Sequence, residues 1–147
     1  MTVDLSITGS QDTVGAGFDT LNGDFANLTG STFNDLLTGN GNDNVIVGCS
    51  GMDTINAGSG NDTLVVDTGD AVAGETYNGG VGTDTLQLTD TADFTGSSLL
   101  SIEKLLFSTF SASTATFTSG QLGGANLSVI LTVTGDANAD HIVVNMT

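Results

Sequence analysis

Aspartate and glycine recur together in a fixed pattern through the first 90 residues. The motif is Gly-x-Gly-x-Asp-x-apolar, and its cleanest copy is GGVGTDTLQ at residues 79–87. Further copies lie at residues 15–21, 30–37, 39–45, 48–55 and 58–64, the first two being weaker. Calcium prefers oxygen ligands, from carboxylates and from backbone carbonyls that glycine turns can direct inward. The pattern therefore predicts calcium-binding turns.

The spacing of the aspartates predicts a coiled chain. Asp35, Asp43, Asp53 and Asp62 are separated by 8, 10 and 9 residues. A unit of roughly nine residues accommodates a turn of about six and a strand of about three, so two units make one coil of about 18. Residues one coil apart stack at about 4.8 Å. We therefore expect Asp35 to stack on Asp53, and Asp43 on Asp62.

Stacked carboxylates need a cation between them. Two bare carboxylates at that separation repel by about 1 kcal/mol in water and about 3 to 4 kcal/mol at an effective dielectric constant near 20. The apolar residue two positions after each aspartate is expected to point into a narrow core, as at Val45, Ile55, Leu64 and Leu86. The candidate calcium ligands are Asp19, Gly30, Asp35, Gly39, Gly41, Asp43, Gly48, Gly51, Asp53, Gly58, Gly60, Asp62, Asp70, Gly80, Gly82, Asp84 and Asp140.

Two of these candidates leave alternatives open. Asp70 lies 17 residues after Asp53, and Glu75 could replace or assist it, whereas a solvated loop explains the segment equally well. Asp140 is followed by Ile142, which fits a degenerate copy of the repeat. The segment 136–147 does not fit an EF-hand, because His141 stands where that loop needs glycine.

The sequence predicts one all-β domain over residues 1–147. About residues 1–90 form a right-handed parallel β-roll, which continues over about 91–147 as a wider parallel β-helix and cap. There the glycine motif fades and larger apolar residues thicken the core, with rungs of roughly 20 residues. Strands are expected at 104–107, 127–133 and 141–144, and a short helical turn at 97–103.

Composition restricts the partners. Seventeen acidic residues stand against one lysine, Lys104, and give a net charge of −16, which excludes nucleic acid and favours cations. No apolar run reaches the length of a membrane span. The single Cys49 excludes an internal disulfide, and the N-terminus lacks a signal-peptide pattern, so export would use another route.

We expect no enzymatic activity. A zinc protease of the His-Glu-x-x-His type needs two histidines, and His141 is the only one. No nucleophile motif accompanies it for triad chemistry. Metal-bound carboxylates are poor proton donors, which argues against a glycosidase pair.

The repeat at 79–87 resembles the nonapeptide of hemolysin-type (RTX) calcium-binding proteins, and residues 2–35 resemble a longer repeat of large members of that family. Cys49, Phe33 and the 22-residue gap from Asp62 to Asp84 depart from the pattern. The resemblance implies a fragment of a larger bacterial protein that leaves the cell by type I secretion, folds on calcium, and serves at the cell surface or outside it.

Three functions fit such a module. The first is a structural segment of a surface layer, adhesin or exoprotein, with self-association as a further expectation. The alternative is a calcium-dependent carbohydrate-binding module of a secreted enzyme, whose partner would be a cell-surface glycan. An ice-binding face would need threonine and asparagine in register on one flat side, and the sequence places them poorly in phase.

Overall fold

The chain is described by a computed structural model that covers residues 1–14, 17–21, 23–108, 112–121, 127–135 and 138–145. The described residues form sixteen strands and no helix, which confirms the predicted all-β class. Most of these strands are three residues long, and between residues 27 and 58 a glycine turn ends each one.

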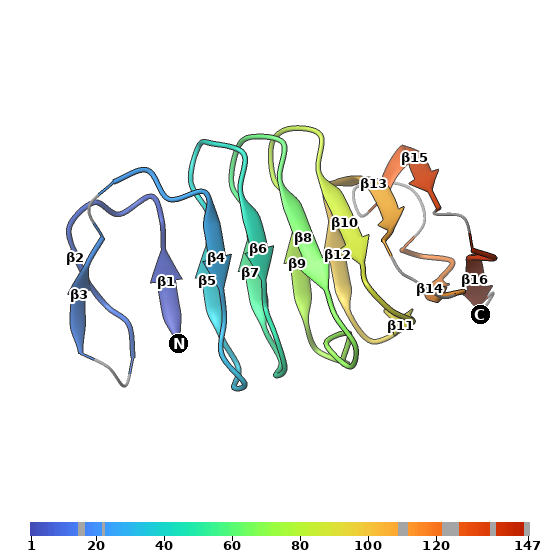
Figure 1. Ribbon diagram of the computed structural model, residues 1–147, viewed down its shortest axis with the longest axis horizontal. Helices are drawn as coiled ribbons and strands as arrows, with labels where there is room; N and C mark the ends of the chain where they lie inside the picture. The colour runs from blue at the N-terminus through green and yellow to red at the C-terminus, as the bar shows by residue number, and fades with distance from the viewer. Residues whose placement is uncertain (15–16, 22, 109–111, 122–126, 136–137, 146–147) are drawn as a thin grey trace.

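The strands stack in parallel into a solenoid with two principal sheets (Figure 1). The first sheet contains β1 (Thr2–Asp4), β5 (Leu36–Thr38), β7 (Thr54–Asn56), β9 (Thr76–Asn78) and β12 (Ser98–Leu100). The second sheet contains β4 (Asn27–Thr29), β6 (Val45–Val47), β8 (Thr63–Val66), β10 (Thr85–Leu88), β13 (Ile102–Phe107) and β15 (Leu127–Thr134). From β4 to β10 the chain alternates between the two sheets, so each turn carries it from one sheet to the other.

The register confirms the predicted coil of two repeats and explains its interruption. Leu36 pairs with Thr54, and Val45 pairs with Thr63, so each strand lies against the strand two repeats later. The next coil is longer, because Thr54 pairs with Thr76. The additional residues lie in the connection between β8 and β9, and they account for the wide gap between Asp62 and Asp84.

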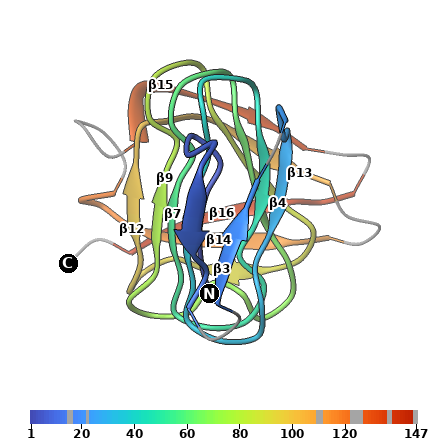
Figure 2. The same cartoon turned by 90° about the vertical axis from the view of Figure 1, so that its left-hand side faces the viewer.

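The core of the roll is filled by one inward-facing side chain from each short strand. In each short strand the middle residue points inward and its neighbours point outward, as the period of two requires. Ile55, Leu64 and Leu86 are fully buried, as predicted. The prediction for Val45 is wrong: it is 41% exposed, and Ile46 occupies the core instead. Viewed along the stack, the coils superpose as a flattened tube (Figure 2).

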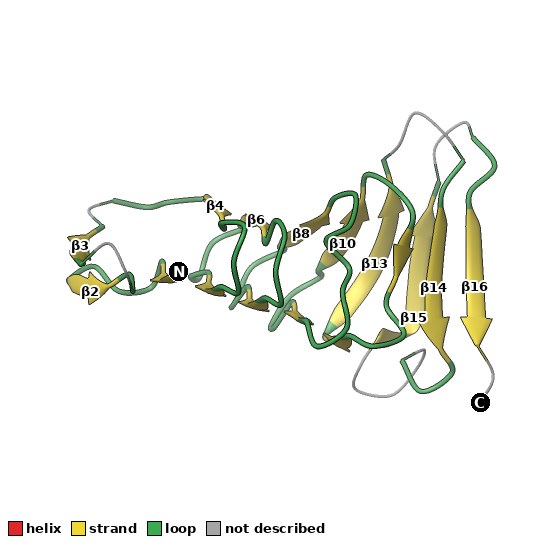
Figure 3. Cartoon of the chain, turned by 90° about the horizontal axis from the view of Figure 1, so that it is seen from below, coloured by secondary structure: helices red, strands yellow, loops and turns green. Residues whose placement is uncertain are grey.

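The solenoid widens toward its C-terminal end (Figure 3), as predicted. A third parallel sheet appears there and contains β11 (Ala92–Asp93), β14 (Thr114–Thr118) and β16 (His141–Asn145). Phe94 stacks on Phe117 at 5.3 Å between ring centroids, and Tyr77 meets Phe94 edge-on at 5.9 Å. These rings fill the larger interior. The predicted helical turn at 97–103 is wrong, because this segment contains β12 and the start of β13.

The N-terminal region departs from the roll. β2 (Ser10–Asp12) pairs antiparallel with β3 (Phe18–Thr20), which places Asp19 opposite Gln11. The weak repeat at 15–21 was predicted to form a calcium turn of the roll. Its strand β3 does not belong to the roll, because it pairs with β2 and joins neither principal sheet. The side chain of Asp19 lies outside the described set.

Candidate metal centre

Buried carboxylates line both edges of the roll. They occupy what we call the inner position, the residue immediately before a strand of the first or second sheet. This residue lies two before the inward-facing apolar residue, so the same alternation directs its side chain inside. The inner positions are Asp35, Asp53 and Glu75 on the first edge and Asn44, Asp62 and Asp84 on the second, all less than 9% exposed.

Along the second edge, the inner aspartates Asp62 and Asp84 each accept a backbone hydrogen bond from the coil before them. The Asn44 amide donates to Oδ1 of Asp62 at 2.7 Å, and the Asp62 amide donates to Oδ1 of Asp84 at 2.8 Å. The Asp84 amide donates in turn to Oε2 of Glu103 at 2.8 Å. Carboxylates are thus held one above another by amides that the turns leave free.

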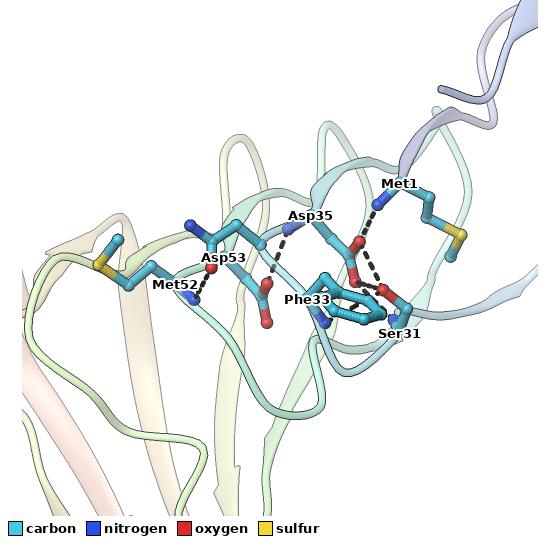
Figure 4. A network of polar contacts seen from close by, with 7 residues as sticks. Met1, Ser31, Phe33, Asp35, Met52 and Asp53 are labelled. Atoms are coloured by element: carbon cyan, nitrogen blue, oxygen red, sulfur yellow. Dashed lines mark hydrogen bonds and ion pairs between the residues drawn. The ribbon is translucent and has the colours of Figure 1, made fainter. Parts of the chain in front are cut away.

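The first edge repeats this arrangement (Figure 4). The Asp35 amide donates to Oδ1 of Asp53 at 2.9 Å, so the predicted stacking of these two residues is confirmed. The Asp35 carboxylate also accepts hydrogen bonds from Ser31 and contacts the Met1 ammonium. Burial raises the pKa of Asp35, but these donors outweigh it, and the pKa lies below its ordinary value.

Three buried carboxylate oxygens in the described part of the chain accept no hydrogen bond. They are Oδ2 of Asp53, Oδ2 of Asp62 and Oδ2 of Asp84. Burial is the largest cause that raises the pKa of each of these groups, and neighbouring carboxylates add to it. An ionised group without a partner is costly in such a place. A bound proton or a cation would remove that cost.

Oxygen atoms pack closely against the first glycine of the turn. A Cβ at Gly79 would lie 2.6 Å from Oδ2 of Asp84 and 2.2 Å from the Ser101 carbonyl oxygen. A Cβ at Gly30 would lie 2.7 Å from Oδ2 of Asp35 and 2.3 Å from the carbonyl oxygen of Gly48. At Gly39 the two nearest oxygens are the Ala57 carbonyl oxygen and the amide Oδ1 of Asn44, and at Gly48 the nearest is Oδ2 of Asp53. Carboxylate and carbonyl oxygens therefore lie close together at Gly30 and Gly79, and this donor set suits calcium.

The remaining candidate glycines serve the stacking of the turns. Gly51, Gly58, Gly60, Gly80 and Gly82 have positive φ angles, and each Cα faces backbone atoms of the preceding coil. Gly41 differs, because a Cβ there would meet nothing within 4 Å.

The copy at 39–45 is one residue out of the predicted register. Val45 pairs with Thr63, so Asn44 and not Asp43 lies level with Asp62. The predicted stacking of Asp43 on Asp62 is therefore wrong. Asp43 is exposed, and its Oδ1 accepts the Asn61 amide at 2.7 Å. The residues that precede the inner positions thus form a second, outer ladder of hydrogen bonds. On the first edge, Oδ1 of Asn34 accepts the Met52 amide in the same way.

Glu75, rather than Asp70, lies level with Asp53 on the first edge, since Thr76 pairs with Thr54. Asp70 is buried beside this ladder, where its Oδ2 accepts the Asp67 amide at 3.0 Å. Oε2 of Glu75 accepts hydrogen bonds from the Tyr77 hydroxyl at 2.6 Å and the Val72 amide at 2.9 Å. Burial nevertheless raises the pKa of Glu75 to about 7.

Asp140 repeats the inner position in the third sheet. Its Oδ1 accepts the Ser113 amide at 3.2 Å, and its Oδ2 lies 2.9 Å from the place of a Gly135 Cβ. This is the geometry of Asp53 and Gly48, with the same spacing of five residues. The interpretation as a degenerate repeat is consistent with that geometry.

No three histidine, cysteine, aspartate or glutamate side chains converge on one point among the residues that are described. A cation would therefore take much of its coordination from backbone carbonyls. The described residues also contain no helix suited to crossing a membrane. The chain matches no family model, no curated protein and no solved structure.

Proposed function

We propose that this chain is a calcium-binding structural module of a secreted bacterial protein, of the hemolysin-type repeat kind. The observation that carries the proposal is the set of three buried, unpaired carboxylate oxygens on Asp53, Asp62 and Asp84. They lie on turns whose glycines leave room for backbone carbonyls to approach. The net charge of −16 adds a field that attracts cations.

Calcium fits this donor set better than other metals. It accepts six to eight oxygen ligands in loose geometry, whereas magnesium requires a near-ideal octahedron and retains water. Zinc prefers thiolate and imidazole ligands. His141 is exposed, and burial raises the pKa of Cys49, which disfavours the thiolate. Those two side chains are therefore poor zinc ligands in this structure.

A structural role also fits the chemistry that the chain carries. His141 lies on β16 and Cys49 in the turn before β7, so the single histidine and the single cysteine of the sequence belong to different coils. The proposal is that folding in calcium-rich surroundings after type I secretion is the module's task. Its place would then be the cell surface or the extracellular medium.

Removal of calcium is expected to unfold most of the roll at neutral pH. A site with a Kd near 0.1 mM contributes about 1.4 kcal/mol in 1 mM calcium, and several sites together rival the stability of a small domain. Far-ultraviolet circular dichroism in excess chelator should lose most of the strand signal, and calcium should restore it. Magnesium at equal concentration is the control. A strand signal that chelator leaves unchanged would contradict the proposal.

Asp62→Asn is expected to weaken calcium binding at least tenfold, and Asp43→Asn less than twofold. Both substitutions remove one negative charge and retain an oxygen that can accept the same amide. Only Asp62 is buried with an unpaired oxygen. Isothermal titration of both variants and the wild-type chain compares them. Equal losses of calcium affinity would mean that the ion is held by net charge and not by the carboxylates at the inner positions.

A carbohydrate-binding role remains a second proposal, supported by the outer face of the first sheet. Thr54 pairs with Thr76, and Asn56 with Asn78, so hydroxyl and amide groups lie in register there. The Asn78 amide donates to Oδ1 of Asn56 at 3.3 Å. In the sequence, the poor phase of threonine and asparagine argued against an ice-binding face, and on these two strands the pairing brings them into register. A glycan array probed with the calcium-loaded chain distinguishes this role from a purely structural one.

A further inference from the structure

The inner ladder of the second edge continues beyond the last glycine repeat. Thr85 pairs with Lys104, which places Glu103 level with Asp84. The Asp84 amide donates to Oε2 of Glu103 at 2.8 Å, as other inner amides donate to the next aspartate. Glu103 lies in β13, and no Gly-x-Gly-x motif precedes it. The repeat pattern therefore does not identify it.

Oxygen atoms converge beside this pair. Asp84 is fully buried at 0% exposure, and its Oδ2 accepts no hydrogen bond. This atom and the Ser101 carbonyl oxygen lie 2.6 and 2.2 Å from the place that a Gly79 Cβ would occupy. Ser101 has a φ of 51°, a left-handed conformation that non-glycine residues seldom adopt. Ser101 thus resembles the positive-φ residues of the glycine turns.

The charge around Asp84 is not balanced by the protein. Asp62 and Glu103 both lie near enough to raise the pKa of Asp84, after burial itself. Lys104 follows Glu103 directly but is exposed, and the buried Leu105 after it places Lys104 on the outer face of β13. Lys104 therefore points away from the carboxylates, and a bound cation is the available counter-charge.

We propose that Asp84, Glu103 and the Ser101 carbonyl form a calcium site at the junction between the last glycine repeat and the wider helix. The inference rests on the proposed function and adds a ligand that the repeat does not contain. Since Asp84 belongs to the last glycine turn and Glu103 to the first strand beyond it, the ion joins the two parts of the solenoid.

The test is calcium titration of the full chain as wild type, Glu103→Gln and Asp24→Asn. Glu103→Gln keeps an oxygen for the Asp84 amide and removes one charge, while Asp24 is an exposed acid that supplies the same charge change elsewhere. Isothermal titration should show one fewer bound calcium ion in Glu103→Gln and an unchanged number in Asp24→Asn. An unchanged number and affinity in both variants overturns the site.

A measurement on the wild-type chain guards against a variant that fails to fold. The chain has two glutamates, Glu75 and Glu103, so carboxyl-selective 13C labelling of glutamate gives two resonances. The Glu103 resonance should shift with calcium, and a Glu103 resonance that stays fixed while other sites fill overturns the site alone. Absence of any calcium binding by the wild type would instead refute the proposed function.

Discussion

Acidification from about pH 8 to about pH 5 is expected to refold the calcium-free chain in part and to weaken the calcium-loaded one. Burial raises the pKa of Glu75 to about 7 and raises those of Asp53, Asp62 and Asp84 above 3.8. Between the ordinary and the raised pKa, the folded chain binds protons that the unfolded chain does not. The free energy of unfolding therefore rises as pH falls through the raised values.

Glu75 defines the window of this effect. Its pKa moves from 4.5 to about 7, and the side chain is 2% exposed, so its protonation contributes on the order of 3 kcal/mol between those pH values. Loss of net negative charge acts in the same direction. Bound calcium reverses the pH dependence of the free energy of unfolding, because protons then compete with the ion for the carboxylates.

Thermal melts followed by circular dichroism, in chelator and in millimolar calcium, compare the two pH profiles. The profile in chelator should fall with rising pH, and the profile in calcium should rise. Glu75→Gln keeps an acceptor for Tyr77 and removes the titrating group, so it should flatten the chelator profile near pH 6. Parallel profiles with and without calcium would show that the buried carboxylates do not bind the ion.

The sequence predicts the repeating part of the fold because two independent periodicities agree there. Glycine turns recur about every nine residues, and Ile55 and Leu64 follow each aspartate by two positions. Burial of an apolar residue and of an aspartate two before it then follows from strand alternation. The stacking of Asp35 on Asp53 was predictable on this ground.

Register fails where the two periodicities disagree. At 39–47 the motif contains Asp43 and Asn44 in succession, and both Val45 and Ile46 are apolar. The position of Asp43 suggested a register in which Val45 is buried. Pairing with the neighbouring coils imposes the other register, in which Ile46 and Asn44 are buried at 0% and 1% exposure. The distance from Gly39, five residues as from Gly48 to Asp53, was the signal that could have resolved it.

Spacing left Glu75 as an alternative to Asp70 and did not identify Glu103. The coils that separate them from Asp53 and Asp84 are both longer than the coils of the regular repeat. Insertions change the number of residues in a connection without changing which residues stack. Only the strand pairing establishes that these carboxylates continue the two edges.

Gly80→Ala is expected to destabilise the calcium-loaded chain by about 2 to 4 kcal/mol, and Gly41→Ala by less than about 0.5 kcal/mol. Gly80 has a φ of 96°, and its Cβ would lie 2.1 Å from the Gly58 carbonyl oxygen. That oxygen accepts the Val81 amide at 2.9 Å and cannot move without loss of this bond. Alanine there combines left-handed strain with a backbone clash.

Gly41 is the control because it is a turn glycine of another copy of the motif and meets neither constraint. A Cβ at this exposed position has nothing within 4 Å, and its φ is not in the left-handed region. Unfolding by urea in millimolar calcium measures both variants. The repeat pattern assigns both glycines to a turn, so equal losses would mean that the motif acts through flexibility. Unequal losses would mean that contact between successive coils fixes the place of each glycine.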